Sequence, residues 1–231
     1  MPAMKATPDQ SDRLHRFAHD LRNRLAAIQQ AIMQLHEAPE ADRGELIHFA
    51  EQQYFKAMRS TEELLDDFGI DRVMCSLKLG PVDLSGLVSE AIGRQRHRIE
   101  RKGQSIQLDM EPGVRVLGDP HWLDQLVTAL VSNASKFSAH GSRIRVSLRC
   151  EAGSAILNVE DEGIGMDAED LEQVFTRYAL LKGRSTAGEA QGRSTLARAQ
   201  QWAEAHGGSL RAFSSGTGQG SSFALSIPLL R

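Results

Sequence analysis

The sequence predicts an α+β protein in two parts, a helical hairpin followed by a sheet with helices on one face. In the first third, apolar residues recur at alternating steps of four and three, whereas several later segments alternate apolar and polar residues. Between the two patterns stands KLGPVD, in which Gly80 and Pro81 mark a boundary. We therefore expect one domain over residues 9–76 and a second over residues 83–231.

The first helix is predicted from about Asp9 to about His36. Its apolar residues have the spacing of the seam of a packed helical bundle. These residues are Leu14, Ala18, Leu21, Leu25, Ile28, Ile32 and Leu35. A helix with this seam needs at least one apolar partner.

A second helix supplies that partner. The segment EAPEADRG interrupts the first pattern with Pro39 and Gly44, and a new helical pattern runs from about Glu45 to about Val73. Two long helices joined by a short loop form an antiparallel hairpin, which has too little surface to cover both of its apolar stripes. We therefore expect a homodimer in which two hairpins form a four-helix bundle.

The second part mixes strands and helices in an irregular order. Strands are predicted at 105–110, 143–148, 155–159, 209–213 and 222–229, and helices at 119–137 and 194–206. This order favours an α+β sandwich with helices on one face of a mixed sheet.

The composition excludes several classes of protein. Hydrophobic residues make up 41% and charged residues 25% of the chain, and the formal net charge of −3 predicts no nucleic-acid partner. Cys75 and Cys150 lack a CxxC spacing, which is typical of free thiols in a reducing compartment. No window approaches the roughly 18 apolar residues of a membrane span, so we expect a cytoplasmic protein without membrane insertion.

The segment FAHDLRNRL places three polar residues, called the trio below, within the first predicted helix. His19 and Asn23 are one turn apart, near the exposed face, and Asp20 can hydrogen-bond one imidazole nitrogen so that the other keeps its lone pair for nucleophilic attack. Two other interpretations stay open at this point. The trio can be an ordinary solvated helix face, or His15 and His19 can hold a metal ion, although no third ligand is apparent.

Two segments of the second part carry nucleotide chemistry. VEDEGIGMD places Asp161 at the end of an apolar strand, where it can accept from an adenine amino group, before the turn of Gly163 and Gly165, whose lack of side chains lets the backbone approach a ligand. About 30 residues earlier, LVSNASKF offers Asn133 as a magnesium ligand and Lys136 as a partner for phosphate. Together they predict a site for an adenine nucleotide and Mg²⁺.

With these motifs the chain resembles the two-component sensor histidine kinases over nearly its whole length. FAHDLRNRL resembles the phospho-acceptor H box, LVSNASKF the N box, DEGIGM the G1 box and VFTRY a weaker F box, while AEAHGGSL is similar to the segment after the ATP lid. The resemblance implies a dimerisation and histidine-phosphotransfer domain followed by a Bergerat-type (GHKL) α/β sandwich. It also implies the receiver domain of a response regulator as partner.

The same resemblance assigns roles to single residues. His19 would be phosphorylated, with Asp20 as its activating partner, and Asn23 would orient the water that dephosphorylates the regulator. Asn133 would bind magnesium and Asp161 would recognise adenine.

The chain departs from the family pattern at three places. Arg24 stands where the family usually has proline, so the helix should kink less there. Ala129 replaces a polar residue that commonly begins the N box. The third departure is the lid, where the expected glycine-rich run falls on QGRSTL.

The altered lid bears on catalysis, because backbone amides approach phosphate best where no Cβ intervenes. Gln191, Arg193 and Thr195 occupy the glycine places; a shifted frame would use Gly188 and Gly192 instead, with Arg193 supplying charge. The sequence therefore predicts a histidine autokinase, with activity weakened by the lid. The alternative is an ATP-independent histidine phosphotransferase or phosphatase with a degenerate ATP-binding domain; a pure scaffold would leave the trio unexplained.

Overall fold

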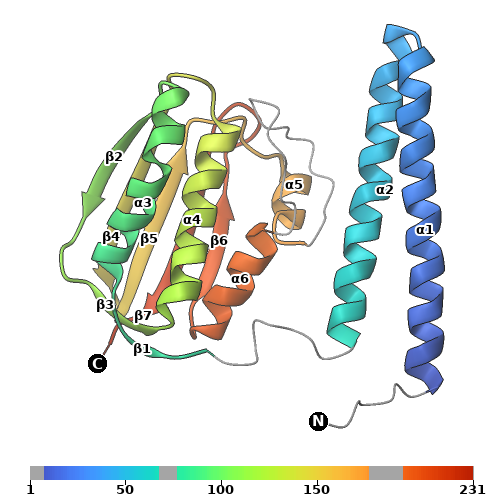
Figure 1. The fold of residues 1–231 in the computed structure, drawn as a ribbon. Helices are drawn as coiled ribbons and strands as arrows, with labels where there is room; N and C mark the ends of the chain where they lie inside the picture. The colour runs from blue at the N-terminus through green and yellow to red at the C-terminus, as the bar shows by residue number, and fades with distance from the viewer. Residues whose placement is uncertain (1–7, 68–76, 177–194, 231) are drawn as a thin grey trace. The chain divides into compact units, whose positions relative to one another are not determined.

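The computed structural model describes residues 8–67, 77–176 and 195–230. The chain divides into two compact units, Met1–Arg72 and Val73–Arg231 (Figure 1). The first is helical and the second combines a mixed sheet with helices, so the predicted α+β class is confirmed.

The first unit is a hairpin of α1 (Pro8–Glu37) and α2 (Glu40–Asp67). Helix α1 has nearly the predicted bounds, but α2 begins about five residues earlier than predicted and contains Gly44. The acidic side chains of Glu40 and Asp42 lie in the first turn of α2, where they interact favourably with the positive end of the helix dipole. This interaction offsets the cost of Gly44 in a helix, which is about 1 kcal/mol relative to alanine. The predicted end of the helix at Val73 lies outside the described residues.

The hairpin covers only part of the apolar seam of α1. Leu21, Ile28 and Leu35 of the seam are partly buried, and Ala31, which lies outside the seam, is buried. In contrast, the other large residues of the seam keep about half of their surface exposed: Leu14 at 48%, Leu25 at 53% and Ile32 at 50%. One hairpin alone therefore leaves an apolar strip in contact with solvent.

The second unit is built on a five-stranded sheet. In spatial order its strands are β2 (Ser105–Met110), β4 (Arg143–Glu151), β5 (Ser154–Asp161), β7 (Ser221–Pro228) and β6 (Ser209–Phe213). Strands β2 and β4 are parallel and every other neighbouring pair is antiparallel. Strands β1 (Gly80–Asp83) and β3 (Arg115–Gly118) form a separate antiparallel pair. The register places Asp161, the last residue of β5, between Ile144 and Ser221.

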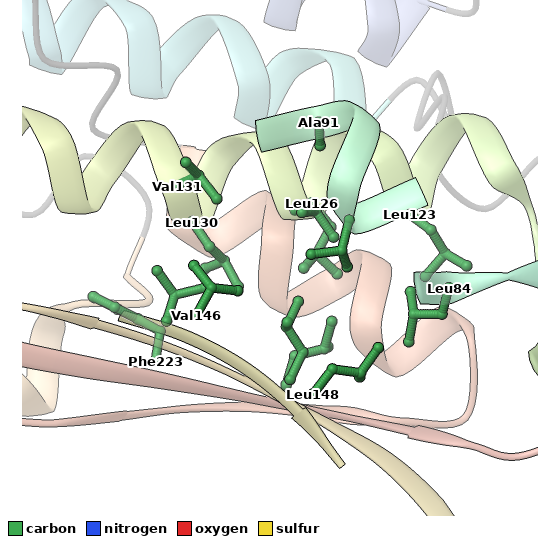
Figure 2. Close-up of a cluster of buried hydrophobic side chains, with 14 of the residues drawn as sticks. Leu84, Ala91, Leu123, Leu126, Leu130, Val131, Val146, Leu148 and Phe223 are labelled. Carbon is green, nitrogen blue, oxygen red and sulfur yellow. The ribbon is translucent and has the colours of Figure 1, made fainter. Parts of the chain in front are cut away.

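Helices α3 (Leu84–Arg101), α4 (Pro120–Phe137) and α6 (Thr195–Ala205) cover one face of this sheet, and the short α5 (Ala168–Gln173) follows β5 (Figure 1). Alternation along the strands directs one set of side chains toward the helices. Figure 2 shows Leu126 and Leu130 of α4 among Val146 and Phe223 of the sheet, all of them at most 1% exposed. The core thus fixes α4 against β4, β5 and β7.

Aspartate caps fix where three helices of this unit begin. Asp83 accepts a hydrogen bond from the Gly86 amide at the start of α3, and Asp119 accepts one from His121 at the start of α4. Asp167 does the same at the start of α5. Such caps satisfy amides that have no partner within the helix.

Candidate functional site

The polar trio lies on the exposed surface of α1. The side chains of His19 and Asp20 are 66% and 62% exposed. The imidazole Nδ1 lies 3.4 Å from Asp20 Oδ1 and 3.3 Å from the Asn23 amide nitrogen. Both recorded contacts thus involve the same ring nitrogen, Nδ1.

This geometry links the protonation of the ring to its reactivity. With a proton on Nδ1, the ring donates to Asp20, and Nε2 keeps its lone pair. With the proton on Nε2, Nδ1 instead accepts from Asn23. Asp20 therefore favours the form of His19 in which Nε2 is a nucleophile.

The helix runs without interruption past the trio. Arg24 follows Asn23 inside α1, which continues to Glu37. The Arg24 side chain is partly buried, and its Nε has no hydrogen-bond partner among the described residues. With no proline at this place, the sequence-based expectation of a weak or absent kink fits one continuous helix.

In the second unit, Asp161 lies at the carboxyl end of β5 and is only 8% exposed. Burial raises the pKa of its carboxyl to about 6. Interactions with the Gly163 and Ser221 amides and with the Ser138 side chain lower the pKa, but by less than burial raises it. The Gly163 amide lies 2.9 Å from Asp161 Oδ1. A buried carboxyl at a strand end, with a pKa close to neutral pH, can accept a hydrogen bond from a donor on a ligand.

The turn after Asp161 is held between α4 and the β6–β7 hairpin. The Ile164 amide donates to Phe137 O at 3.1 Å, and the Gly220 amide donates to Gly163 O at 3.1 Å. A Cβ on Gly163 would lie 2.6 Å from Phe137 O. Glycine is therefore required at this place by the protein's own backbone.

Gly165 shows the same requirement more strongly. Its φ is +65°, and a Cβ there would lie 2.1 Å from Gly216 O. The next amide, of Met166, donates to the Ser214 hydroxyl at 2.9 Å. The sequence pattern suggested these glycines for close approach to a nucleotide, but packing inside the protein already accounts for them.

The last two turns of α4 lie beside this turn. Asn133 and Lys136 are partly buried there, and Ala129, one turn earlier, is 7% exposed. Ser138, which follows the helix, forms a backbone bridge with Gly163. The structure thus brings the end of α4, which carries Asn133 and Lys136, close to the turn that follows Asp161.

Two groups of residues at this site were missed by the sequence patterns. The Ser138 backbone pairs with Gly163, and the glycine-rich turn between β6 and β7 packs on the G1 turn through Gly216, Gly218 and Gly220. The signal for the turn was present, since SGTGQG has glycines at alternate positions between two predicted strands.

Comparisons with known proteins agree with this arrangement. Residues 118–231 match the family of histidine kinase-, DNA gyrase B- and HSP90-like ATPases. The sensor-like histidine kinase SenX3 of Mycolicibacterium smegmatis is 31% identical over 234 residues, which cover 97% of this chain. The sensor protein ChvG of Agrobacterium fabrum is 30% identical over 241 residues, which cover 95% of this chain. Residues 118–231 thus carry the features of this ATPase family, and the chain as a whole is similar to two-component sensor histidine kinases.

Solved structures of histidine kinases resemble this one. The mycobacterial sensor histidine kinase MprB superposes with a TM-score of 0.59 and 26% identity over 65% of this chain and 98% of that one. The Acinetobacter baumannii histidine kinase AdeS, at 20% identity, shares the fold with a TM-score of 0.59 over 92% of this chain and 98% of that one. The chain spans 58% of SenX3 and 40% of ChvG.

Several features predicted from the sequence lie outside the described residues. They include Gly188, Gln191, Gly192 and Arg193 of the lid, the end of VFTRY, and Cys75. Thr195 and Leu196, by contrast, begin α6.

Two further observations concern membrane spans and metal sites within the described ranges. No helix of residues 8–67, 77–176 and 195–230 is both long and apolar enough to cross a membrane. In the same ranges, no group of three or more His, Cys, Asp or Glu side chains is placed to hold a metal ion, so His15 and His19 have no third ligand there.

Proposed function

We propose that this chain phosphorylates itself on His19 with ATP and passes the phosphoryl group to an aspartate of a response regulator in the cytoplasm. The observation that carries the proposal is the exposed imidazole of His19, whose Nδ1 contacts Asp20 while Nε2 keeps its lone pair. A solvated helix face needs no such pairing. The second unit matches a family of ATPases, so ATP is the phosphoryl donor proposed for His19.

The chemical step follows from this geometry. The Nε2 lone pair forms a bond to the γ-phosphorus while the bond from that phosphorus to the bridging oxygen breaks, and the electron pair leaves on ADP. The proton on Nδ1 of His19 passes toward Asp20, which lies 3.4 Å away. In the second step a carboxylate oxygen of the regulator attacks the phosphorus, the N–P bond breaks and the imidazole regains its proton.

Residues of the second unit divide the work of binding ATP. Asp161, buried at the end of β5, would accept from the amino group of adenine, and Lys136 would contact phosphate. Asn133 would hold magnesium through its amide oxygen. One protein ligand suits Mg²⁺, which keeps several waters and binds substrate phosphates, where it would neutralise charge as the phosphoryl group transfers.

Asn23 supports the reverse flow of phosphate. Its amide lies one helical turn from the acceptor and 3.3 Å from Nδ1 of His19. From there it can orient a water molecule toward a phosphorylated regulator bound at the same surface. The proposed enzyme is thus both a kinase and a regulator phosphatase.

The hairpin is proposed to act as a homodimer. Leu14, Leu25 and Ile32 leave an apolar strip on α1, and Ile47 and Tyr54 of α2 are also about half exposed. Burying such a strip contributes about 25 cal/mol per Å² of apolar surface. A second hairpin that presents the same strip would complete a four-helix bundle.

The alternative, an ATP-independent phosphotransferase or phosphatase, is not favoured by relatives named as histidine kinases. It predicts that a non-hydrolysable ATP analogue binds no better than ADP and that autophosphorylation is slow. Calorimetry with both nucleotides separates the two functions. Magnesium-dependent preference for the triphosphate would show that Gly188, Gly192 and Arg193 form a working lid.

The test of the main proposal is labelling with γ-labelled ATP and magnesium. Label on the wild type should be acid-labile and alkali-stable, as phosphohistidine is, and His19→Ala should abolish it. His15→Ala is the matched control, because His15 is an exposed histidine one turn away on the same helix, and it should label normally. Wild-type labelling of His19→Ala would refute the assignment.

A further inference from the structure

The exposed apolar strips of α1 and α2 lie on the same side of the hairpin. The strip of α1 contains Ile32, which follows the buried Ala31, and the strip of α2 contains Ile47, which follows the partly buried Leu46. One residue turns about 100° round a helix, in the same sense for both helices. Because α1 and α2 are antiparallel, this shared sense of rotation brings both strips to one side. A second hairpin can therefore cover both strips at once.

Two-fold symmetry decides which helices then meet. When the axis runs parallel to the helices, a half-turn places α1 of each copy against α2 of the other. The outer border of a strip is the side that faces away from the other helix of the same hairpin. In the dimer, the outer border of the α1 strip therefore runs beside the outer border of the α2 strip of the second copy.

These two borders carry complementary charges. On α1 the border follows steps of seven residues, which drift by only about 20° round a helix. Its members are all exposed: His15, Arg22, Gln29 and His36. On α2 the border contains Glu40, which is exposed, and Glu51, which is partly buried and three turns further along the same side. The border of α1 thus has basic side chains and no acid, and the border of α2 has acids.

Within one hairpin the two borders lie on opposite edges. Arg22 and Glu51 have no ionic partner among the described residues of the hairpin. In the dimer they lie at similar heights, since Arg22 is 15 residues before the end of α1 at Glu37 and Glu51 is 11 residues after the start of α2 at Glu40. The difference is about one helical turn, or about 6 Å, which two long side chains can span.

We propose that Arg22 of one copy pairs with Glu51 of the other along both edges of the bundle, and that these two pairs make the hairpin select a second copy of its own chain. The inference rests on the homodimer proposed above. The apolar strips contribute affinity for any hairpin with a similar strip, whereas charges that border such a seam determine which partner binds and in which orientation.

The first test is charge reversal in the full chain, followed by sedimentation at low salt. Arg22→Glu and Glu51→Arg should each weaken the dimer about tenfold, because two attractive pairs become two repulsive pairs. The variant that carries both substitutions should dimerise like the wild type, because the exchanged charges attract on both edges.

The second test mixes the two single variants and counts their dimers by native mass spectrometry, in which the three possible dimers differ in mass. Mixed dimers should predominate, because both of their edges again join opposite charges, one in the original and one in the exchanged order. If Arg22 paired with Glu51 of its own chain, each variant would carry its repulsion into every dimer and no preference would appear.

Matched controls reverse the same charges on the faces that point away from the strips. Arg16→Glu and Glu45→Arg change exposed residues, each six positions before the residue under test. They should leave the dimer affinity unchanged and should mix at random. Salt at about 1 M should remove the preference for mixed dimers, because it screens charges beyond about 3 Å, but it should not dissociate the wild-type dimer.

Different outcomes refute different proposals. A dimeric wild type whose affinity is unaffected by either charge reversal, or whose variants mix at random, would overturn the inference and leave the homodimer in place. A wild type that stays monomeric at every concentration would overturn the proposed homodimer itself. If a single variant does not fold, the variant with both substitutions decides the question, since its failure to dimerise would also overturn the pairing.

Discussion

Lowering the pH from about 7 to about 5 should weaken the binding of adenosine through protonation of Asp161. Burial raises the pKa of this carboxyl to about 6. The amino group of adenine is a donor, so it requires the ionised carboxylate as acceptor. About nine-tenths of the carboxyl is ionised at pH 7 and about one-tenth at pH 5, which predicts a loss of about tenfold in affinity, or about 1.4 kcal/mol.

The stability of the free protein should respond to Asp161 in the opposite direction. Its pKa in the folded state, about 6, lies above the ordinary value of 3.8. The folded state therefore binds more protons between these values, and the free energy of unfolding falls as the pH rises through this range. The difference is about 3 kcal/mol at most, seen by subtracting the pH dependence of Asp161→Asn from that of the wild type.

Calorimetry across this pH range, with adenosine as ligand, checks the first effect, because adenosine has no phosphate that titrates near pH 6. Asp161→Asn should bind adenosine weakly and without a transition near pH 6. Glu160→Gln is the control, since Glu160 is the preceding residue of β5 and pairs with Arg145 on the solvent-facing side of the sheet at 2.8 Å; its pH profile should match the wild type. A wild-type affinity that stays flat from about pH 5 to about pH 7, or a transition that survives in Asp161→Asn, would refute the reasoning.

Three other substitutions test separate parts of the molecule. Asn23→Ala should slow dephosphorylation of the regulator and spare phosphotransfer through His19, measured with labelled regulator; equal loss of both would make Asn23 structural. Leu25→Lys should dissociate or unfold the dimer in sedimentation, whereas Met33→Lys, at a side chain already 66% exposed, should not; a monomeric wild type would contradict this. Gly165→Ala should destabilise the fold by several kcal/mol more than Gly153→Ala in denaturant titrations, because both have positive φ but only Gly165 lacks room for a Cβ. Similar losses would show that the loop adjusts.

The sequence predicted all five strands of the sheet because apolar and polar residues alternate along each of them. SIQLDM and SLRAF match β2 and β6 residue for residue. Helix α3 was not predicted, although Val88, Ala91, Ile92 and Ile99 form its buried face, since Gly86, Gly93 and four arginines obscure the stripe. Strands β1 and β3 are four residues each, too short for alternation to be visible.

Candidate site residues were predictable where all the residues that contact one another lie in one short sequence motif. His19, Asp20 and Asn23 lie within one helical turn, so helical spacing alone brings them together. Ser138 was not predictable as a partner of Gly163, and neither was Lys102 as a partner of Ser138, because 25 and 36 positions separate them. Only tertiary packing of α3, α4 and β5 brings such residues into contact.

The packing of Gly163 and Gly165 affects how sequences descended from this protein should be interpreted. A descendant that no longer used ATP would still need both glycines for folding, so the DEGIGM motif would survive the loss of activity. Asp161 would come under the opposite pressure, because replacing a buried carboxyl of raised pKa by a neutral residue removes a cost to folding at neutral pH. Among such sequences, the presence of this aspartate distinguishes nucleotide-binding members better than the glycines beside it.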